Sequence, residues 1–213
     1  MTLAPSEVDA RFDRTIDRWF RDQLAMQPEA ATFFGIHDHD GELSPGGRDA
    51  IDDQVAFFRR TIDELSAFDP AELSDERALD RDLAIHQARL GLHWQTEYRS
   101  WAGSSGGAGH IGEALFPLFT RDFAPLRDRL ESIAQRLDAA PRFLAETRER
   151  VTDPVKLWTE IDLETTDHMP SFLDTILAAA RTDAGHSESN ETCPEDYAGW
   201  VLGFLERVLA PAS

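Results

Sequence analysis

The sequence predicts an all-α protein, an irregular bundle of about seven to nine helices with no significant β-sheet. Apolar residues recur at spacings of three and four along most of the 213 residues, which is the period of one helix face. Proline and glycine lie at the breaks between these stretches. No strand pattern longer than four residues competes, and the length suits a single helical domain over residues 1–213.

The predicted helices follow from the apolar spacing and from local start and stop signals. They cover about residues 6–26, 30–36, 44–65, 74–101, 111–119, 125–139, 141–151, 154–181 and 194–209. Ser6 followed by Asp9 is typical of an N-cap, and Ser44 directly before a proline predicts the start of the third helix. Pro141 should separate two helices, and Pro170 should kink the long one, because proline lacks an N–H and crowds the preceding turn.

Two segments are expected to be flexible loops. Residues 102–109 are glycine and serine with alanine, and residues 182–195 are polar and acidic. Pro117 should interrupt the short apolar helix after the first loop. The inward face of the helix before that loop is predicted to carry Leu79, Leu83, Leu90 and Trp94.

The charge constrains partners more than chemistry. Forty acidic residues outnumber 21 basic ones, the net charge is -19, and Lys156 is the only lysine. Such a surface repels phosphates and anionic lipids, so no nucleic-acid and no membrane partner is expected. The excess of acids favours a halophilic protein, whereas a GC-rich genome would explain only the missing lysines. With no basic N-terminal segment and no apolar run of ~18 residues, a cytoplasmic location is expected.

The sequence offers metal-ligand residues but no complete motif. There is no His-Glu-x-x-His, Gly-x-Ser-x-Gly, Walker or dinucleotide pattern, and a lone Cys193 excludes a Cys-based zinc site. No catalytic or cofactor-binding residue is predicted. Three groups could contribute metal ligands: His37 with His39, His86 with His93 and Glu97, and Glu160 with Glu164 and His168.

Each of these three groups also has a simpler interpretation. The first can be a polar turn in which Asp38 and Asp40 cap the backbone. The second lies on one helix face at i, i+7 and i+11, and the third at i, i+4 and i+8. Carboxylate bundles that bind two metals instead use Glu-x-x-His on paired helices. Both faces are therefore equally compatible with solvated polar surfaces.

Two runs carry a resemblance to a known family. Residues 34–44 read Phe-Gly-Ile-His-Asp-His-Asp-Gly-Glu-Leu-Ser, and residues 68–80 begin Phe-Asp-Pro-Ala-Glu-Leu-Ser. Together with Phe-Ala-Pro-Leu at 123–126 and the run at 137–144, they resemble the N-terminal part of the domain-of-unknown-function family 885. The resemblance covers about residues 8–209.

The resemblance implies a helical, zincin-like metallopeptidase family whose members are usually more than twice this long. Their expected zinc motif, His-Glu-x-x-Pro-Gly-His-His, belongs to the C-terminal half, so no cofactor is expected in this chain and zinc only in that half. The chain would then form a substrate cleft and be inactive alone. It could be a fragment, one half of a split protein that docks a separate catalytic half, or a stand-alone module.

Two alternatives to the cleft-forming interpretation remain open. One is a non-enzymatic helical binding module, and the other is a self-contained metal enzyme that uses the helix-face His and Glu residues. If the chain is a fragment, it should self-associate through the apolar stripe of the last helix, residues 194–209. A catalytic C-terminal half or a second copy are thus the expected partners.

Stability should depend strongly on salt. Carboxylates crowd exposed helix faces, as in the two clusters Asp49, Asp52, Asp53 and Asp75, Glu76, Asp80. Each like-charge pair at i, i+4 costs a few tenths of a kcal/mol in dilute buffer, and salt screens this repulsion. The melting temperature should therefore rise strongly between ~0.1 M and ~2 M potassium chloride, measured by circular dichroism. A flat or falling trend contradicts the halophilic interpretation.

Overall fold

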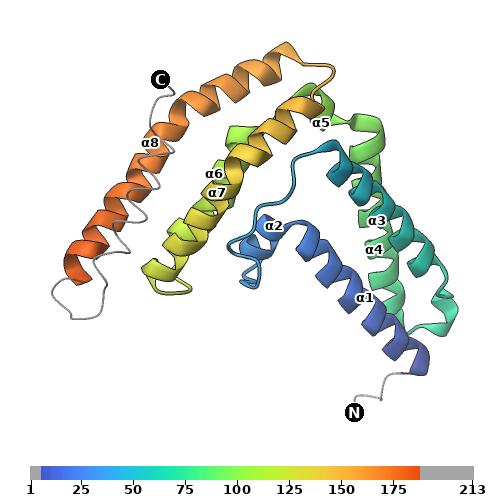
Figure 1. Cartoon of the computed structure of the whole chain (residues 1–213). Helices are drawn as coiled ribbons and strands as arrows, with labels where there is room; N and C mark the ends of the chain where they lie inside the picture. Colours follow the sequence, from blue (N-terminus) through green and yellow to red (C-terminus); the bar gives the residue numbers. More distant parts are fainter. Residues whose placement is uncertain (1–5, 188–213) are drawn as a thin grey trace.

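Two arms of helices meet at a bend in the computed structural model, which describes the backbone of residues 6–187 and the side chains of residues 6–181 (Figure 1). These residues form eight α-helices and no strand, which confirms the all-α prediction. The first arm contains α1 (Glu7–Met26), α3 (Arg48–Ser66) and α4 (Asp75–His93). The second contains α6 (Gly107–Thr120), α7 (Leu126–Arg150) and α8 (Lys156–Ser187). Short α2 (Pro28–Phe33) and α5 (Ser100–Gly103) lie near the junction.

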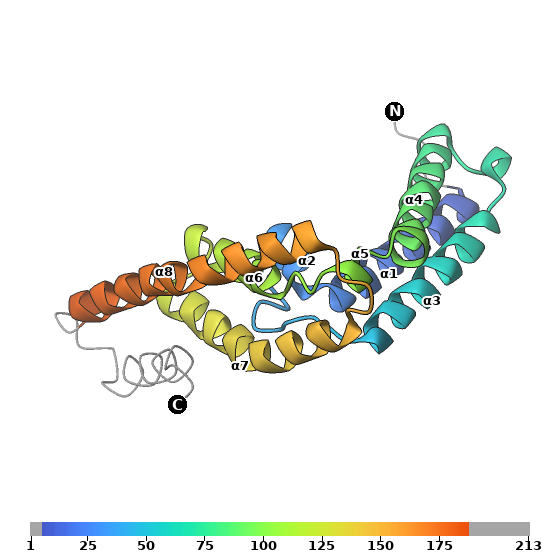
Figure 2. The ribbon, with the colours of Figure 1, turned by 90° about the horizontal axis from the view of Figure 1, so that it is seen from above.

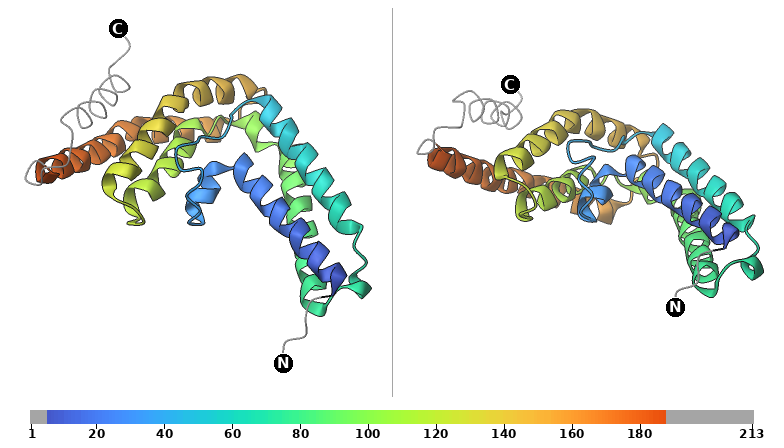
Figure 3. Two further views of the ribbon diagram at one scale, coloured as in Figure 1. Left: turned by 60° about the horizontal axis from the view of Figure 1, so that its bottom comes forward. Right: turned by 90° about the horizontal axis from the view of Figure 1, so that it is seen from below.

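The molecule is elongated because the arms diverge from this junction. Seen from above, α8 and α7 extend to one side and α3 and α4 to the other (Figure 2). Further views show the same bent outline, with α1 beside α3 and α4 (Figure 3). The backbone at the bend is held by Thr152 and Asp153, whose N–H groups donate to Ala102 O at 3.1 and 2.9 Å. Val155 N similarly donates to Gly103 O at 2.9 Å.

The start of the first arm agrees with the sequence. Ser6 Oγ accepts a hydrogen bond from Asp9 N at 3.0 Å, so the predicted N-cap is confirmed. Asp9 in turn accepts from Ser74 N at 2.9 Å, which ties the beginning of α1 to the beginning of α4. Gly35 follows α2 with a φ of 81°, a conformation that glycine adopts without strain.

The third helix begins later than predicted. Ser44 lies in the loop before α3, and the helix begins at Arg48 with Gly47 as its N-cap. The reason is a competing interaction, because the N–H and hydroxyl of Ser44 both donate to Glu29 Oε1, at 2.7 and 3.0 Å. The serine–proline pair therefore lies in the loop and does not start the helix.

The prolines in the second arm do not break their helices. Helix α6 continues through Pro117, α7 is one helix through Pro141 instead of two, and α8 continues through Pro170 to Ser187. Each proline removes a single backbone hydrogen bond, while burial along the rest of the helix is retained. The predicted loop at 182–195 is therefore wrong for 182–187, and its remainder and the predicted helix 194–209 lie outside the described residues.

The glycine-rich segment 102–109 is also mostly helical. It contains the end of α5 and the first turn of α6, and only residues 104–106 between them are not helical. A Cβ on Gly107 would lie 2.7 Å from Leu144 Cδ2, so this glycine permits close packing of α6 on α7. The small residues that predicted flexibility instead allow two helices to approach.

Helix α4 ends in a wider, π-helical turn, after which the chain changes direction. A π-helical turn, η2 (Trp94–Tyr98), follows α4, and Arg99 then adopts a left-handed conformation with a φ of 49°. Trp101 Nε1 donates to Gln95 O at 3.0 Å and spans this change of direction. The single helix predicted for 74–101 is therefore wrong at its C-terminal end.

The buried face of α4 is opposite to the predicted one. Ala84, Ile85 and Ala88 are buried, and a Cβ on Gly91 would lie 2.5 Å from Phe58 Cζ. Small residues thus let α4 approach α3 closely. The residues expected to point inward are exposed instead, namely Leu79 at 70%, Leu83 at 55%, Leu90 at 42% and Trp94 at 47%.

Each arm has its own hydrophobic core. The core between α1, α3 and α4 is built from Phe12, Leu65, Phe68, Leu73, Ala84 and Ile85. The larger core of the second arm combines α6, α7 and α8, with residues that include Leu115, Leu118, Ile133, Leu137, Phe143 and Ile176. Leu43, from the loop after α2, also packs into this second core and links the loop to it.

The side chain of Arg136 is buried inside this arrangement, with 1% of its surface exposed. Its Nε donates to Glu42 O at 2.9 Å, its Nη1 donates to Ala114 O, and its Nη2 donates to Thr32 Oγ1 at 2.6 Å. The hydroxyl of Thr32 in turn donates a hydrogen bond to Asp40 Oδ1 at 2.7 Å. One guanidinium on α7 thereby connects α2, the 34–47 loop and α6.

Replacing Arg136 should unfold much of this junction. Arg136→Leu leaves the carbonyls of Glu42 and Ala114 without donors in a buried site, which should lower the free energy of unfolding by about 3–5 kcal/mol. The matched control Arg142→Leu, at an exposed position of the same helix, should change it by less than about 1 kcal/mol. Urea unfolding measures both, and equal effects would contradict the assigned role of Arg136.

Candidate functional site

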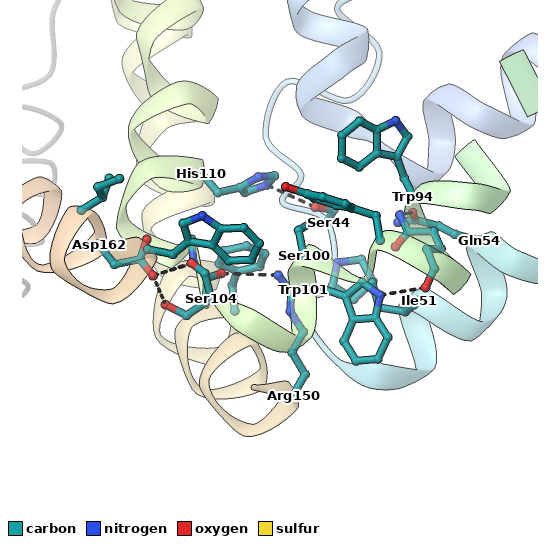
Figure 4. A pocket seen from close by; sticks show the side chains of 18 residues that line it. Ser44, Ile51, Gln54, Trp94, Ser100, Trp101, Ser104, His110, Arg150 and Asp162 are labelled. Atoms are coloured by element: carbon teal, nitrogen blue, oxygen red, sulfur yellow. Dashed lines mark hydrogen bonds between the residues drawn. The ribbon is translucent and has the colours of Figure 1, made fainter. Parts of the chain in front are cut away.

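An open pocket of about 610 Å³ lies at the bend between the arms (Figure 4). Its walls come from the 44–54 region, from η2, from the segment 100–106 and from α6, α7 and α8. The principal side chains are those of Ser44, Gln54, Trp94, Tyr98, Trp101, Ser104, His110, Phe143, Arg150, Trp158, Ile161 and Asp162. Both arms contribute, so the pocket exists only because the bend is held.

One wall of the pocket is aromatic. The rings of Trp94 and Tyr98 have centroids 4.5 Å apart, and those of Tyr98 and Trp158 are 6.1 Å apart. Gly103 permits this row, because a Cβ there would lie 2.7 Å from Trp158 Cζ3. Such a wall can hold an apolar or planar group by packing and ring contacts.

Two serines and a carboxylate form the wall beside α8. Ser104 Oγ donates to Asp162 Oδ2 at 2.6 Å, and Ser105 Oγ lies 3.4 Å from the same oxygen. Gly106 N also points to this carboxylate, at 3.3 Å. The serine hydroxyls pair with a carboxylate and not with a histidine, so this wall does not contain the Ser–His pair typical of a serine nucleophile.

A second polar group joins three separate segments. His110 Nε2 lies 3.2 Å from Glu29 Oε1 and 3.4 Å from Ser44 Oγ, and its ring stacks on Phe143 with a centroid distance of 4.7 Å. Burial alone would raise the pKa of Glu29, but the hydrogen bond and charge of His110 and the N–H of Ser44 together lower it below 4.5.

This group is not a catalytic triad. In a triad, one imidazole nitrogen faces the serine and the other faces the acid. Here the same nitrogen, Nε2 of His110, faces both Ser44 and Glu29. The arrangement can orient the loop and bind polar groups, but it is not set up to transfer a proton from serine through histidine.

Arg150 closes the pocket on the side of α7. Its Nη1 donates to Gly46 O at 2.8 Å, its Nη2 lies 3.4 Å from Ser105 O, and its buried Nε has no hydrogen-bond partner. Burial lowers the pKa of this guanidinium. Arg150 therefore connects the loop before α3 with the loop before α6 and places a positive charge at the pocket.

The structure places the predicted metal-ligand residues outside this pocket. His37 Nδ1 lies 2.9 Å from Asp40 Oδ2, and its ring stacks on Phe123 with a centroid distance of 3.7 Å. His39 Nδ1 lies 3.1 Å from Glu42 Oε1. These contacts match the interpretation as a hydrogen-bonded polar turn.

The two helix-face groups lie on exposed surfaces. His86, His93 and Glu97 occupy the uncovered side of α4 and η2, and Glu160, Glu164 and His168 lie on exposed positions of α8. His168 Nδ1 is 2.7 Å from Glu164 O. Within the described residues, no three His, Cys, Asp or Glu side chains gather closely enough to hold a metal ion. Metal binding by these groups stays a prediction.

The sequence did not identify Glu29, His110, Arg150 and Asp162 as site residues. Glu29 and His110 are 81 positions apart, and Ser105 is 57 positions from Asp162. Spacing along one helix cannot reveal such pairs. The only local signal was the glycine and serine content of 102–109, whose backbone provides part of the site.

Comparison with known proteins places the chain in a family. The model of a family described as "Bacterial protein of unknown function (DUF885)" matches residues 28–200. The chain belongs to this family. This confirms the family to which the two sequence runs pointed.

A solved structure shares the fold of this DUF885 member. It is described as "The structure of a putative lipoprotein of unknown function from Shewanella oneidensis", with a TM-score of 0.70 and 19% identity. The match covers 92% of this chain and 35% of the other, so the chain spans about a third of that protein. No curated protein matches. Among the described residues, no helix is both long and apolar enough to cross a membrane.

The free energy of unfolding should depend on pH through the ionisation of Glu29. Its pKa in the folded protein lies below the ordinary 4.5, so the carboxylate stabilises the fold above that pH and loses this effect as the pH falls through the folded pKa. The difference in free energy of unfolding between wild type and Glu29→Gln should therefore be present at about pH 5.5–7 and shrink below about pH 4.5. Urea titrations at each pH measure it.

The exposed Glu160→Gln serves as a control, with a small difference throughout the pH range. A Glu29→Gln difference that stays the same down to about pH 3 would contradict the proposed ionic role.

Proposed function

We propose that this chain is the cleft-forming, non-catalytic helical part of a larger metallopeptidase-like protein. The resemblance to the zincin-like family implies a catalytic partner, namely a segment that carries the zinc motif. Family membership and the 35% coverage of the longer structural neighbour support a role as part of a larger whole. The pocket at the bend would then form one wall of the substrate cleft.

The observation that carries this proposal is the second apolar face of α4. One face packs on α3 through Ala84, Ile85 and Ala88. The opposite face presents Leu79, Leu83, Leu90 and Trp94 to solvent. A helix that is apolar on two sides is typical of one buried between layers, and only one layer is present among the described residues.

This uncovered face continues into the bend. Trp94 belongs both to the α4 face and to the aromatic wall, which leads through Tyr98 to Trp158 on α8. Ile161, on the same helix, is half exposed and also lines the pocket. A segment that docks on α4 would therefore reach the pocket. A catalytic half that acts on a substrate in the cleft would have to do the same.

Inactivity of the chain alone is part of the proposal. Ser44, His110 and Glu29 lack triad geometry, and the helix-face His and Glu residues are spread over two exposed surfaces. The cytoplasmic location and the absence of nucleic-acid and membrane partners, expected from the charge, stay predictions. So does self-association through residues 194–209, which lie outside the described part.

A stand-alone binding module is the second candidate. It is favoured by the pocket at the bend, because this chain alone provides aromatic, polar and charged side chains that line it. A self-contained metal enzyme would need stoichiometric zinc, manganese or iron in the purified protein. Metal analysis of the same preparation distinguishes that alternative from the other two.

The test combines the chain with a candidate catalytic half. If the DNA directly downstream encodes the histidine-rich motif, that polypeptide is expressed and mixed with this chain at high salt. Peptidase activity should appear only in the mixture. Leu83→Asp should weaken complex formation at least about tenfold, because it places a charge in the apolar face.

Leu163→Asp is the matched control, since Leu163 is similarly exposed, at 61%, but lies on α8 away from the pocket. It should leave complex formation unchanged. Turnover by the chain alone, downstream DNA without the motif, or equal effects of the two substitutions would each contradict the proposal.

A further inference from the structure

The positive charge of Arg150 has no negative partner in the described structure. No Asp or Glu oxygen among the described residues forms an ion pair with it. Its two hydrogen bonds go to neutral backbone carbonyls, those of Gly46 and Ser105. Its Nε is buried and makes no hydrogen bond at all. An unpaired, largely buried cation is costly, so its position requires an explanation.

Arg136, which is more deeply buried, shows how such a charge can be compensated. Near Arg136 the carboxylates of Glu29, Asp40 and Glu42 offset the effect of burial on its pKa, whereas near Arg150 only burial acts. Glu146 and Glu149 lie on the same turns of α7, and Glu146 accepts from Gly46 N, but among the described residues no carboxylate forms an ion pair with Arg150. The missing counter-charge would have to come from outside the described residues.

The surroundings of Arg150 suit a small ligand. Guanidinium Nη1 and Nη2 each use one N–H on a carbonyl, and each has a second N–H to offer. The pocket of about 610 Å³ lies within the range of small-molecule sites. Trp94, Tyr98 and Trp158 form the aromatic wall of the same pocket.

We propose that the bend pocket binds a small monocarboxylate that carries an aromatic or bulky apolar group. The carboxylate pairs with Arg150, and the apolar group packs on Trp94, Tyr98 and Trp158 (Figure 4). Asp162, which accepts from Ser104 and lies near Ser105, adds a negative charge to the same pocket and disfavours a second carboxylate on the ligand. This inference goes beyond the proposed function and does not depend on it.

The first experiment needs no variant. The chain is titrated calorimetrically, at a salt concentration that keeps it folded, with 3-phenylpropionate and with its neutral analogue 3-phenyl-1-propanol. The acid should bind with a Kd of about 1 mM or tighter, and the alcohol at least about tenfold more weakly. Equal affinities, or no binding of the acid up to about 10 mM, would overturn the proposal.

Variants then assign the two ends of the ligand. Arg150→Met should remove the preference for the acid, and Trp158→Ala should weaken acid and alcohol alike. Arg142→Met, at an exposed position of the same helix, is the control and should change neither. Because Arg150 also holds two loops, Arg150→Met could fail to fold, and circular dichroism checks this.

Arg150→Lys keeps the charge and is the second variant for that case. A lysine cannot reproduce the two-pronged donor geometry, so the ratio between acid and alcohol should fall at least about threefold. A ratio unchanged in the folded arginine variants would overturn the assignment of the carboxylate to Arg150. None of these measurements involves peptidase activity, so their outcome is independent of the docking proposal.

Discussion

The junction of the two arms depends on the buried guanidinium of Arg136. A cation enclosed this deeply is stable only when its donors are matched, and here carbonyls and a hydroxyl from three other segments surround it. The match works in both directions, because the guanidinium also provides a donor for the carbonyl of Glu42 in the 34–47 loop. Asp40 extends the network by accepting from Thr32 and lying 2.9 Å from His37. The loop that resembled a metal site is therefore a structural connection, and its conformation fixes where Ser44 meets Glu29 and His110.

The pocket follows from that connection. Once the 34–47 loop is fixed to α7, its continuation reaches Glu146, which accepts from Gly46 N at 2.8 Å, and Arg150, which donates to Gly46 O. The same arginine contacts the loop before α6, so both loops converge on one turn of α7. The aromatic row lines the same pocket. Arg136 thus has a full set of partners and holds the fold, whereas Arg150 has an incomplete set and faces a cavity. This difference separates a structural arginine from one available to a ligand.

The sequence predicted the type of structure better than the contacts within it. Periodicity located most helices, and Ser6 located the start of α1, because both signals act within a few residues. Periodicity could not decide which side of α4 is buried, since Ala84 and Ala88 are less apolar than Leu83 and Leu90 yet permit a closer approach to α3. The sequence predicted that Pro117, Pro141 and Pro170 break or kink their helices. Each proline removes only one backbone hydrogen bond, and packing along the helix offsets that loss. The site joins residues such as Glu29 and His110 across 81 positions, and no local pattern encodes such a pair.

The charge of the chain also bears on what can cover α4. The exposed stripe is bordered by the exposed carboxylates of Glu76, Asp80 and Asp82, of which Glu76 and Asp82 pair with Arg77 and Arg81. In a symmetric dimer the same patch meets itself, so pairing through this stripe would bring the carboxylate of Asp80 and its equivalent in the second copy to the same interface. Like charges across an interface cost free energy at low salt, and apolar burial must first offset that cost. A partner with a basic or neutral rim avoids the penalty and gains complementarity instead. Electrostatics therefore favours a different polypeptide over a second copy as the occupant of this face.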